Sequence, residues 1–136
     1  MNLTKEEIIE NSKLIAEFMN LKVKKFMFSY NLYNQRGYRI LKWGLSSEKE
    51  LWIQLNDNNF YHSSWNWLMP VLEKIENMDF VTSIQIDKTK DVYLTPCTHA
   101  CIFDGTDLEI IEEADNKFHA IYKAVVCFIN WYNNKK

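Results

Sequence analysis

The sequence predicts an α+β fold, with residues 1–136 forming a single domain in which three helices pack against one mainly antiparallel sheet of five or six strands. The chain has 136 residues, which is the usual size of one domain. Hydrophobic residues make up 47% of it, enough for a substantial core. Helical spacing of apolar residues marks three segments, and alternation joined by short polar turns marks the strands.

The first helix is expected to begin at Thr4 and to run to Asn20, because Thr4 and Glu7 have the spacing of a capping box. Alternation then predicts three strands, and Gly37 permits a turn after the first of them. The first strand alternates through Phe26, Phe28, Tyr30 and Leu32, the second runs from Tyr38 to Trp43, and the third alternates through Leu51, Ile53 and Leu55.

The second helix is expected to be capped by Ser63 or Ser64, with Trp65 on its buried face and Trp67 outside that face. Pro70 either lies in the first turn or kinks this helix. Two or three further strands and a final helix complete the predicted order α-β-β-β-α-β-β-(β)-α. The strands are Phe80 to Ile86, a strand that opens with Val92 to Leu94 and is ended by Pro96, and, if there is a third, a continuation over 98–103. The final helix runs from about Ala114 to Asn133.

Charge and motif content exclude several classes of function. Lys plus Arg is 16 and Asp plus Glu is 18, a net charge of −2, which disfavours a general nucleic-acid binder. The sequence contains no Walker A, GxGxxG, GxSxG or HExxH pattern, so we expect no enzyme activity and no cofactor.

No apolar run reaches the length of about 18 residues that a membrane span needs. Three cysteines without an apolar leader favour reduced thiols in the cytoplasm.

Cys97, His99 and Cys101 form the sharpest local pattern, because Cys and His are zinc ligands. On a straight strand, however, residues two apart on one face are separated by roughly 7 Å, which is too wide for one ion. We therefore expect buried thiols beside a hydrogen-bonded histidine, with no bound metal. The neighbouring His62 and Ser63 could pair as base and nucleophile, but no third orienting residue is evident. We expect the serines at this position to cap the helix instead.

Basic residues also precede the first aromatic strand. Lys22, Lys24 and Lys25 stand beside Phe26 and Phe28, an arrangement that resembles the sheets of RNA-binding domains. Because the aromatic residues here have the spacing of a core face, direct nucleic-acid binding is the weaker interpretation.

An acidic stretch runs from residue 104 to residue 116 with no basic residue in it. It is either a solvated loop before the last helix or a negative patch that docks on a basic groove. Aromatic residues outside the core stripes are further candidates for partner contact, because Trp is enriched in binding hot spots. The candidate partner-binding residues are Trp52, Trp67, Trp131, Asp104, Asp107, Glu109, Glu112 and Glu113.

Two segments, 61–76 (YHSSWNWLMPVLEKIE) and 120–133 (AIYKAVVCFINWYN), together with 15–19, resemble small uncharacterised proteins encoded by phages and prophages of Bacteroidota. The segment from Pro96 to Asp107 is not part of the resemblance. The resemblance carries no catalytic motif, and it implies a small protein acting in the bacterial cytoplasm.

Accessory phage proteins of this kind often bind a host protein, as anti-CRISPR inhibitors do. We therefore expect a non-catalytic inhibitor of a host defence protein, with a CRISPR RNA-guided nuclease as the leading partner. The alternatives are a nucleic-acid-associated accessory protein and a small metal-dependent enzyme.

Overall fold

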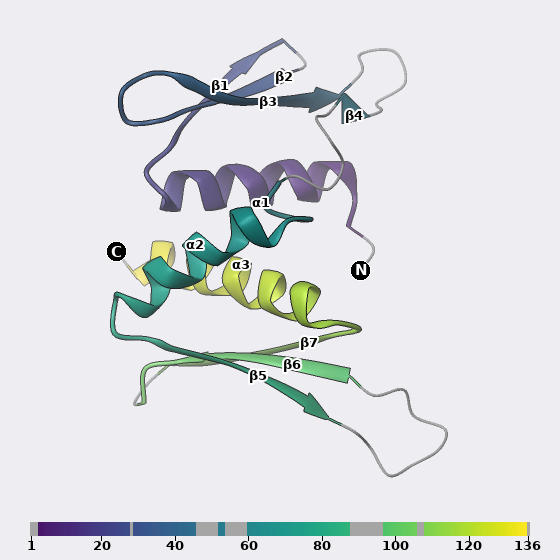
Figure 1. Ribbon diagram of the computed structural model, residues 1–136, viewed down its shortest axis with the longest axis vertical. Coiled ribbons are helices and arrows are strands. Elements are labelled where there is room, and N and C mark those ends of the chain that lie inside the picture. The colour runs from purple at the N-terminus through teal and green to yellow at the C-terminus, as the bar shows by residue number, and fades with distance from the viewer. Residues whose placement is uncertain are drawn as a thin grey trace. The chain divides into compact units, whose positions relative to one another are not determined.

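The computed structural model describes residues 3–27, 29–45, 52–53, 60–87, 97–105 and 108–135. It confirms the α+β class, with three helices in these ranges (Figure 1). The predicted single sheet of five or six strands is wrong, because the strands form two antiparallel sheets with the orders β1-β2-β3-β4 and β5-β6-β7. The chain divides into two compact units, Leu3–Ser64 and Trp65–Lys136, and each unit contains one of the sheets.

Helix α1 (Lys5–Phe18) starts at the predicted capping box. The Glu7 backbone N–H donates to Thr4 Oγ1 at 3.1 Å, and the Thr4 N–H donates to Glu7 Oε1 at 3.3 Å. The helix ends two residues earlier than expected, where Asn20 adopts a left-handed φ of 62°. The Leu21 N–H then donates to the Ala16 carbonyl at 2.9 Å, which closes the helix.

The first predicted strand is in fact a hairpin of two strands. Met27 adopts a φ of 52°, and the Ser29 hydroxyl donates to the Phe26 carbonyl at 3.0 Å across the turn. Leu51 and Leu55, which alternation places in a strand around Ile53, lie outside the described residues. The strands of this sheet are β1 (Lys22–Phe26), β2 (Ser29–Tyr33), β3 (Arg39–Leu45) and β4 (Trp52–Ile53).

Trp43 is the centre of the core of this first unit and is 1% exposed. Its ring stacks on Tyr30 with centroids 5.3 Å apart and lies 5.2 Å from Phe60. Leu32 pairs with a buried leucine of β3 on the same face of the sheet. Phe26, expected in the core, is instead 51% exposed, because the turn at Met27 sets a register in which Phe26 lies on the face opposite Tyr30 and Trp43.

Helix α2 (Trp65–Glu76) directly follows Ser64, one of the two predicted caps. Pro70 lies inside the helix rather than in its first turn, so it removes the backbone hydrogen bond to the Asn66 carbonyl. Trp65 is wrongly predicted as a core residue, because it is 40% exposed. The buried residues of the helix are Leu68, Val71, Leu72 and Ile75.

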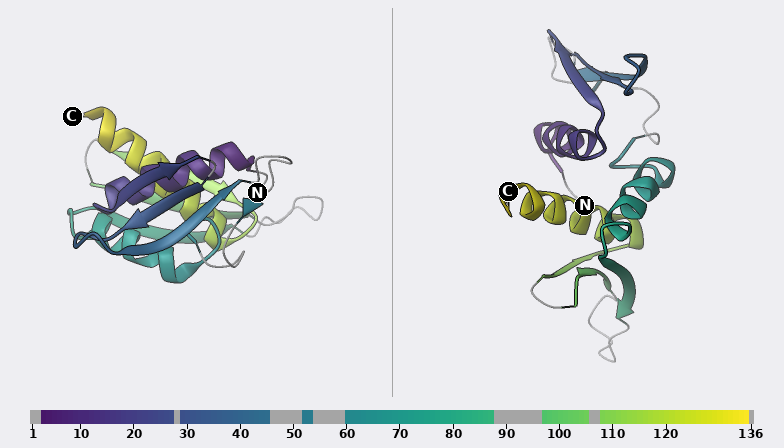
Figure 2. Two further views of the ribbon diagram at one scale, coloured as in Figure 1. Left: turned by 90° about the horizontal axis from the view of Figure 1, so that it is seen from above. Right: turned by 90° about the vertical axis from the view of Figure 1, so that its left-hand side faces the viewer.

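The second sheet contains β5 (Val81–Asp87), β6 (Cys97–Phe103) and β7 (Glu109–Ala114). The loop interpretation of the acidic stretch is therefore wrong for its second half, which pairs with β6 along its full length. The predicted strand at Val92 to Leu94 and the break at Pro96 lie outside the described residues. Helices α2 and α3 lie on one face of this sheet, with α3 across β6 and β7 and α2 against α3 and β5 (Figures 1 and 2).

Helix α3 (Lys117–Lys135) begins three residues later than predicted, because Asn116 caps it. The His119 N–H donates to Asn116 Oδ1 at 2.9 Å, and the Asn116 amide lies 3.2 Å from His119 Nδ1. Partial burial lowers the pKa of His119, which favours the neutral ring that accepts this second hydrogen bond. None of the three helices, as far as the chain is described, is long and apolar enough to cross a membrane.

Candidate functional site

The face of the β5–β7 sheet that points away from α2 and α3 carries exposed side chains among the described residues of the second unit. Side chains alternate along each strand, and paired residues share a face, so the register determines which residues lie there. Ile102 and its partners Thr82 and Ile110 lie beneath the helices. We call the opposite side the open sheet face; its described residues are Val81, Ser83, His99, Cys101, Phe103, Glu109, Ile111 and Glu113.

Apolar side chains occupy much of the open sheet face. Val81 is 51% exposed and Ile111 is 52% exposed, while Phe103 and Cys101 are half-buried. Val81 pairs with Phe103, and Cys101 pairs with Ile111, so these four side chains are neighbours on adjacent strands. A contiguous group of exposed apolar side chains on one sheet face is typical of an interaction site.

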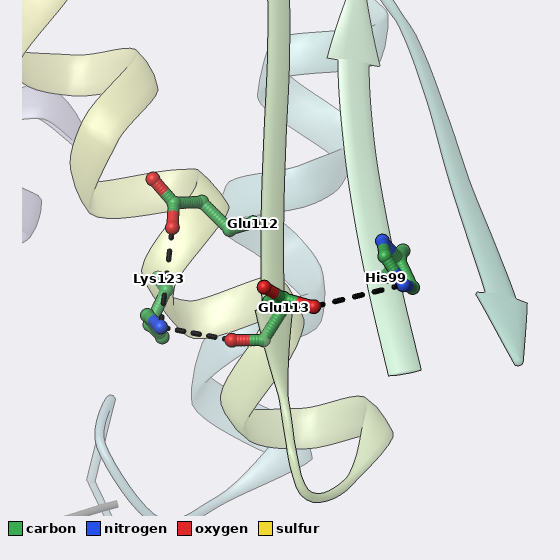
Figure 3. Close-up of polar contacts among 4 residues, drawn as sticks. All are labelled: His99, Glu112, Glu113 and Lys123. Atoms are coloured by element: carbon green, nitrogen blue, oxygen red, sulfur yellow. Dashed lines mark hydrogen bonds and ion pairs between the residues drawn. The ribbon is translucent and has the colours of Figure 1, made fainter. Parts of the chain in front are cut away.

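The acidic residues of β7 are divided between the two faces of the sheet. Glu109 and Glu113 lie on the open sheet face, where Glu113 Oε2 is 3.8 Å from His99 Nε2. Glu112 points to the other side, toward α3, and its Oε2 is 3.9 Å from Lys123 Nζ. Lys123 Nζ also donates to the Glu113 carbonyl at 2.8 Å (Figure 3). The open sheet face therefore carries two of the predicted partner-binding carboxylates, and Glu112 forms contacts with the helix.

Asp104 belongs to the turn that follows β6. Asp104 Oδ1 accepts a hydrogen bond from the Leu108 N–H at 3.1 Å, so its carboxylate helps to form the turn. Gly105 follows with a φ of 87°, a conformation that favours glycine. Asp107 lies outside the described residues. Within the described range, the acidic stretch is therefore divided between a turn and the two faces of one strand.

The three candidate tryptophans occupy different environments. Trp131 is half-buried, with its ring 5.9 Å from Phe80 and 5.8 Å from Phe128. Trp67 is half-buried on α2, and the side chain of Trp52 lies outside the described residues. Trp65 is the exposed aromatic residue of α2, and sequence reasoning missed it. Its ring meets the ring of Phe118 edge-on, with centroids 5.0 Å apart, and part of the Trp65 side chain remains exposed to solvent. Helical spacing places Trp65 on the buried face of α2 and therefore does not predict this exposure.

The metal hypothesis rests on His99 and Cys101, which share the open sheet face; the side chain of Cys97 is not described. Among the residues that are described, no group of three or more His, Cys, Asp or Glu side chains is placed to hold an ion. The third cysteine, Cys127, lies on α3. Burial, followed by the negative charge of Glu112 and a hydrogen bond to it, raises the pKa of the Cys127 thiol. This thiol therefore remains protonated at neutral pH, which makes it a weak nucleophile.

The lysine candidates lie on both sides of the first sheet. Lys22 and Lys24 share with Phe26 the face that points away from the Trp43 core, and Lys24 Nζ lies 5.3 Å from the ring centroid of Tyr33. Lys25 is on the opposite side, 5.9 Å from the ring of Tyr30. Lys42 pairs with Asn31 and adds a third lysine to the first group. We call this group the lysine face; its residues are Lys22, Lys24, Phe26, Tyr33 and Lys42.

The serines after His62 have a structural role. The Phe60 N–H donates to Ser63 Oγ at 3.3 Å, and the Ser64 N–H donates to the Phe60 carbonyl at 2.8 Å, which forms the turn that leads into α2. The same turn brings the ring of Phe60 to 4.9 Å from that of Tyr61, and burial raises the pKa of the Tyr61 hydroxyl.

Comparison of the chain with protein-family models, with curated proteins and with solved structures found no match.

Proposed function

We propose that this chain is a phage-derived, non-catalytic protein that binds and inhibits a host antiviral defence protein, with a CRISPR effector nuclease as the leading partner. The observation that carries the proposal is the open sheet face. Val81 and Ile111 leave about half of their area in water on the two edge strands, β5 and β7, of a sheet whose other face is covered by two helices. A partner that covers these two side chains gains hydrophobic stabilisation.

The charge of the same face indicates the kind of partner. Glu109 and Glu113 flank the apolar group, and the described residues of the open sheet face include no Lys or Arg. Carboxylates around an apolar centre complement a basic protein surface and favour its association. RNA-guided nucleases have such surfaces in the positively charged channels that hold guide and target strands. The phage resemblance supports the same class of partner.

Binding can be tested by co-purifying the chain with candidate host defence complexes and measuring the dissociation constant of any complex that forms. Ile111→Lys is expected to raise that constant about thirtyfold, the effect of losing a hot-spot residue worth about 2 kcal/mol. Ile40→Lys is the matched control, because Ile40 is also an exposed strand isoleucine, at 43%, but lies on the first sheet.

Two results would contradict the proposal. One is the absence of a stable complex with any defence protein tested. The other is an equal loss of binding in Ile111→Lys and Ile40→Lys, which would show that the open sheet face makes no special contribution. Circular dichroism of both variants would confirm that each is folded before binding is compared.

The lysine face favours a second candidate function, association with single-stranded nucleic acid. Lysines beside the exposed ring of Phe26 and the half-buried ring of Tyr33 match the combination of phosphate contact and base stacking that such proteins use. Under this hypothesis the affinity for single-stranded RNA falls steeply with salt, with a slope of about −0.7 for each phosphate contacted. Lys24→Ala is expected to make the slope shallower, and undetectable binding to both RNA and DNA at low salt would exclude this function.

A further inference from the structure

The second unit contains an elongated cavity of about 490 Å³ beneath α2. Trp65, Met69, Leu72 and Glu76 line it from the helix, and their spacing places them in one stripe along α2. From Trp65 to Glu76 the helix advances eleven residues, so this stripe is about 16 Å long at 1.5 Å per residue. The volume lies within the range of small-molecule binding sites.

The other walls of the cavity are largely apolar. Ala100 and Ile102 of β6 form one wall, and Ile121 and Ala124 of α3 form another. Helix α3 packs mainly on β6 and β7, whereas α2 packs on β5 and against α3, and the cavity is lined by residues of all these elements except β7. Met69 is 43% exposed, so the cavity opens to solvent along α2 and an incoming molecule has an entry path.

One end of the cavity is polar and negative. Glu76 is the last residue of α2, and the hydroxyl of Thr82, another lining residue, donates to Glu76 Oε1 at 2.9 Å. The C-terminal end of a helix also carries partial negative charge, which favours a cation there. The described lining residues include no Lys, Arg or His. An apolar channel that ends at a carboxylate is complementary to a chain with a positive end group.

We propose that this cavity binds a small amphiphile, with an extended apolar chain along Met69 and Leu72 and a cationic group beside Glu76. Most of the lining comes from α2, α3 and the helix side of the sheet, and Ser83 and Cys101 of the open sheet face complete it. The probe-binding test needs no defence protein, so its outcome can be separated from that of the proposed function.

The affinity can be measured by isothermal titration calorimetry of the full chain with decyltrimethylammonium, and with decanoate as the anionic counterpart, both below their micelle concentrations. The cationic probe is expected to bind about fivefold more tightly, through its attraction to Glu76. Shortening its chain by two methylenes, to octyltrimethylammonium, is expected to weaken binding about tenfold. Absence of saturable binding, or equal binding of cation and anion, would overturn the proposal.

Two variants assign the binding to this cavity. Glu76→Gln is expected to remove the preference for the cation and to leave the dependence on chain length unchanged. Glu73→Gln is the matched control, because Glu73 is an exposed carboxylate of the same helix that does not line the cavity.

Ala124→Leu places a larger side chain in the cavity and is expected to weaken the binding of both probes at least tenfold. Thermal denaturation would check that this variant is folded. A cation preference that survives Glu76→Gln would refute the assignment.

Discussion

Phe128→Ala is expected to lower the free energy of unfolding by about 3–5 kcal/mol, the usual cost of removing a fully buried aromatic ring. Phe128 is 0% exposed and lies at the centre of an aromatic cluster on α3. Its ring centroid is 4.8 Å from that of Phe80, 5.8 Å from that of Trp131 and 6.1 Å from that of Tyr132. Urea denaturation followed by circular dichroism measures the change.

Phe26→Ala is the control for this variant, because it removes the same ring from a site that is 51% exposed. A partly exposed ring loses less hydrophobic stabilisation, so the expected cost is about 1 kcal/mol or less. Equal losses in the two variants would contradict the assignment of Phe128 to the core.

Trp43→Ala is expected to have a similarly large effect on the first unit, about 3–5 kcal/mol. Trp43 is 1% exposed, and its ring lies between those of Tyr30 and Phe60 at 5.3 and 5.2 Å. Stacked and tilted aromatic pairs add about 0.5–1.5 kcal/mol beyond the area that they bury. The change is measured by urea denaturation, as for Phe128.

Trp65→Ala provides the comparison, because Trp65 is 40% exposed and has one edge-on contact with Phe118. Its loss is expected to cost about 1–2 kcal/mol. A cost for Trp65→Ala that equals or exceeds that of Trp43→Ala would show that the two tryptophans have been assigned the wrong roles.

Features that depend on neighbouring residues could be predicted from the sequence. The capping box of Thr4 and Glu7, the glycine turn at residue 37 and most of the buried face of α2 are all present. Each depends on residues within about two helical turns of one another, so spacing is sufficient to predict it. The turn at Met27 is also local, but it was not predicted. A glycine would have indicated the left-handed φ found there, whereas a methionine does not.

The candidate site was predictable only in part. Glu109, Glu112 and Glu113 stand close together in the sequence, but the strand places the first and third on the open sheet face and the second against Lys123. The alternation of Leu108 and Ile110 with acidic residues was the signal for this strand, but the adjacent acids favoured a loop interpretation.

The sequence by itself determined the α+β class, the approximate positions of the helices and the presence of alternating strands. Those properties follow from local periodicity and from the preferences of cap and turn residues. Only the tertiary structure decided which strands pair, that they form two sheets, and that Val81 and Ile111 remain exposed. Alternation gives a strand two faces but does not determine which face a distant helix will cover.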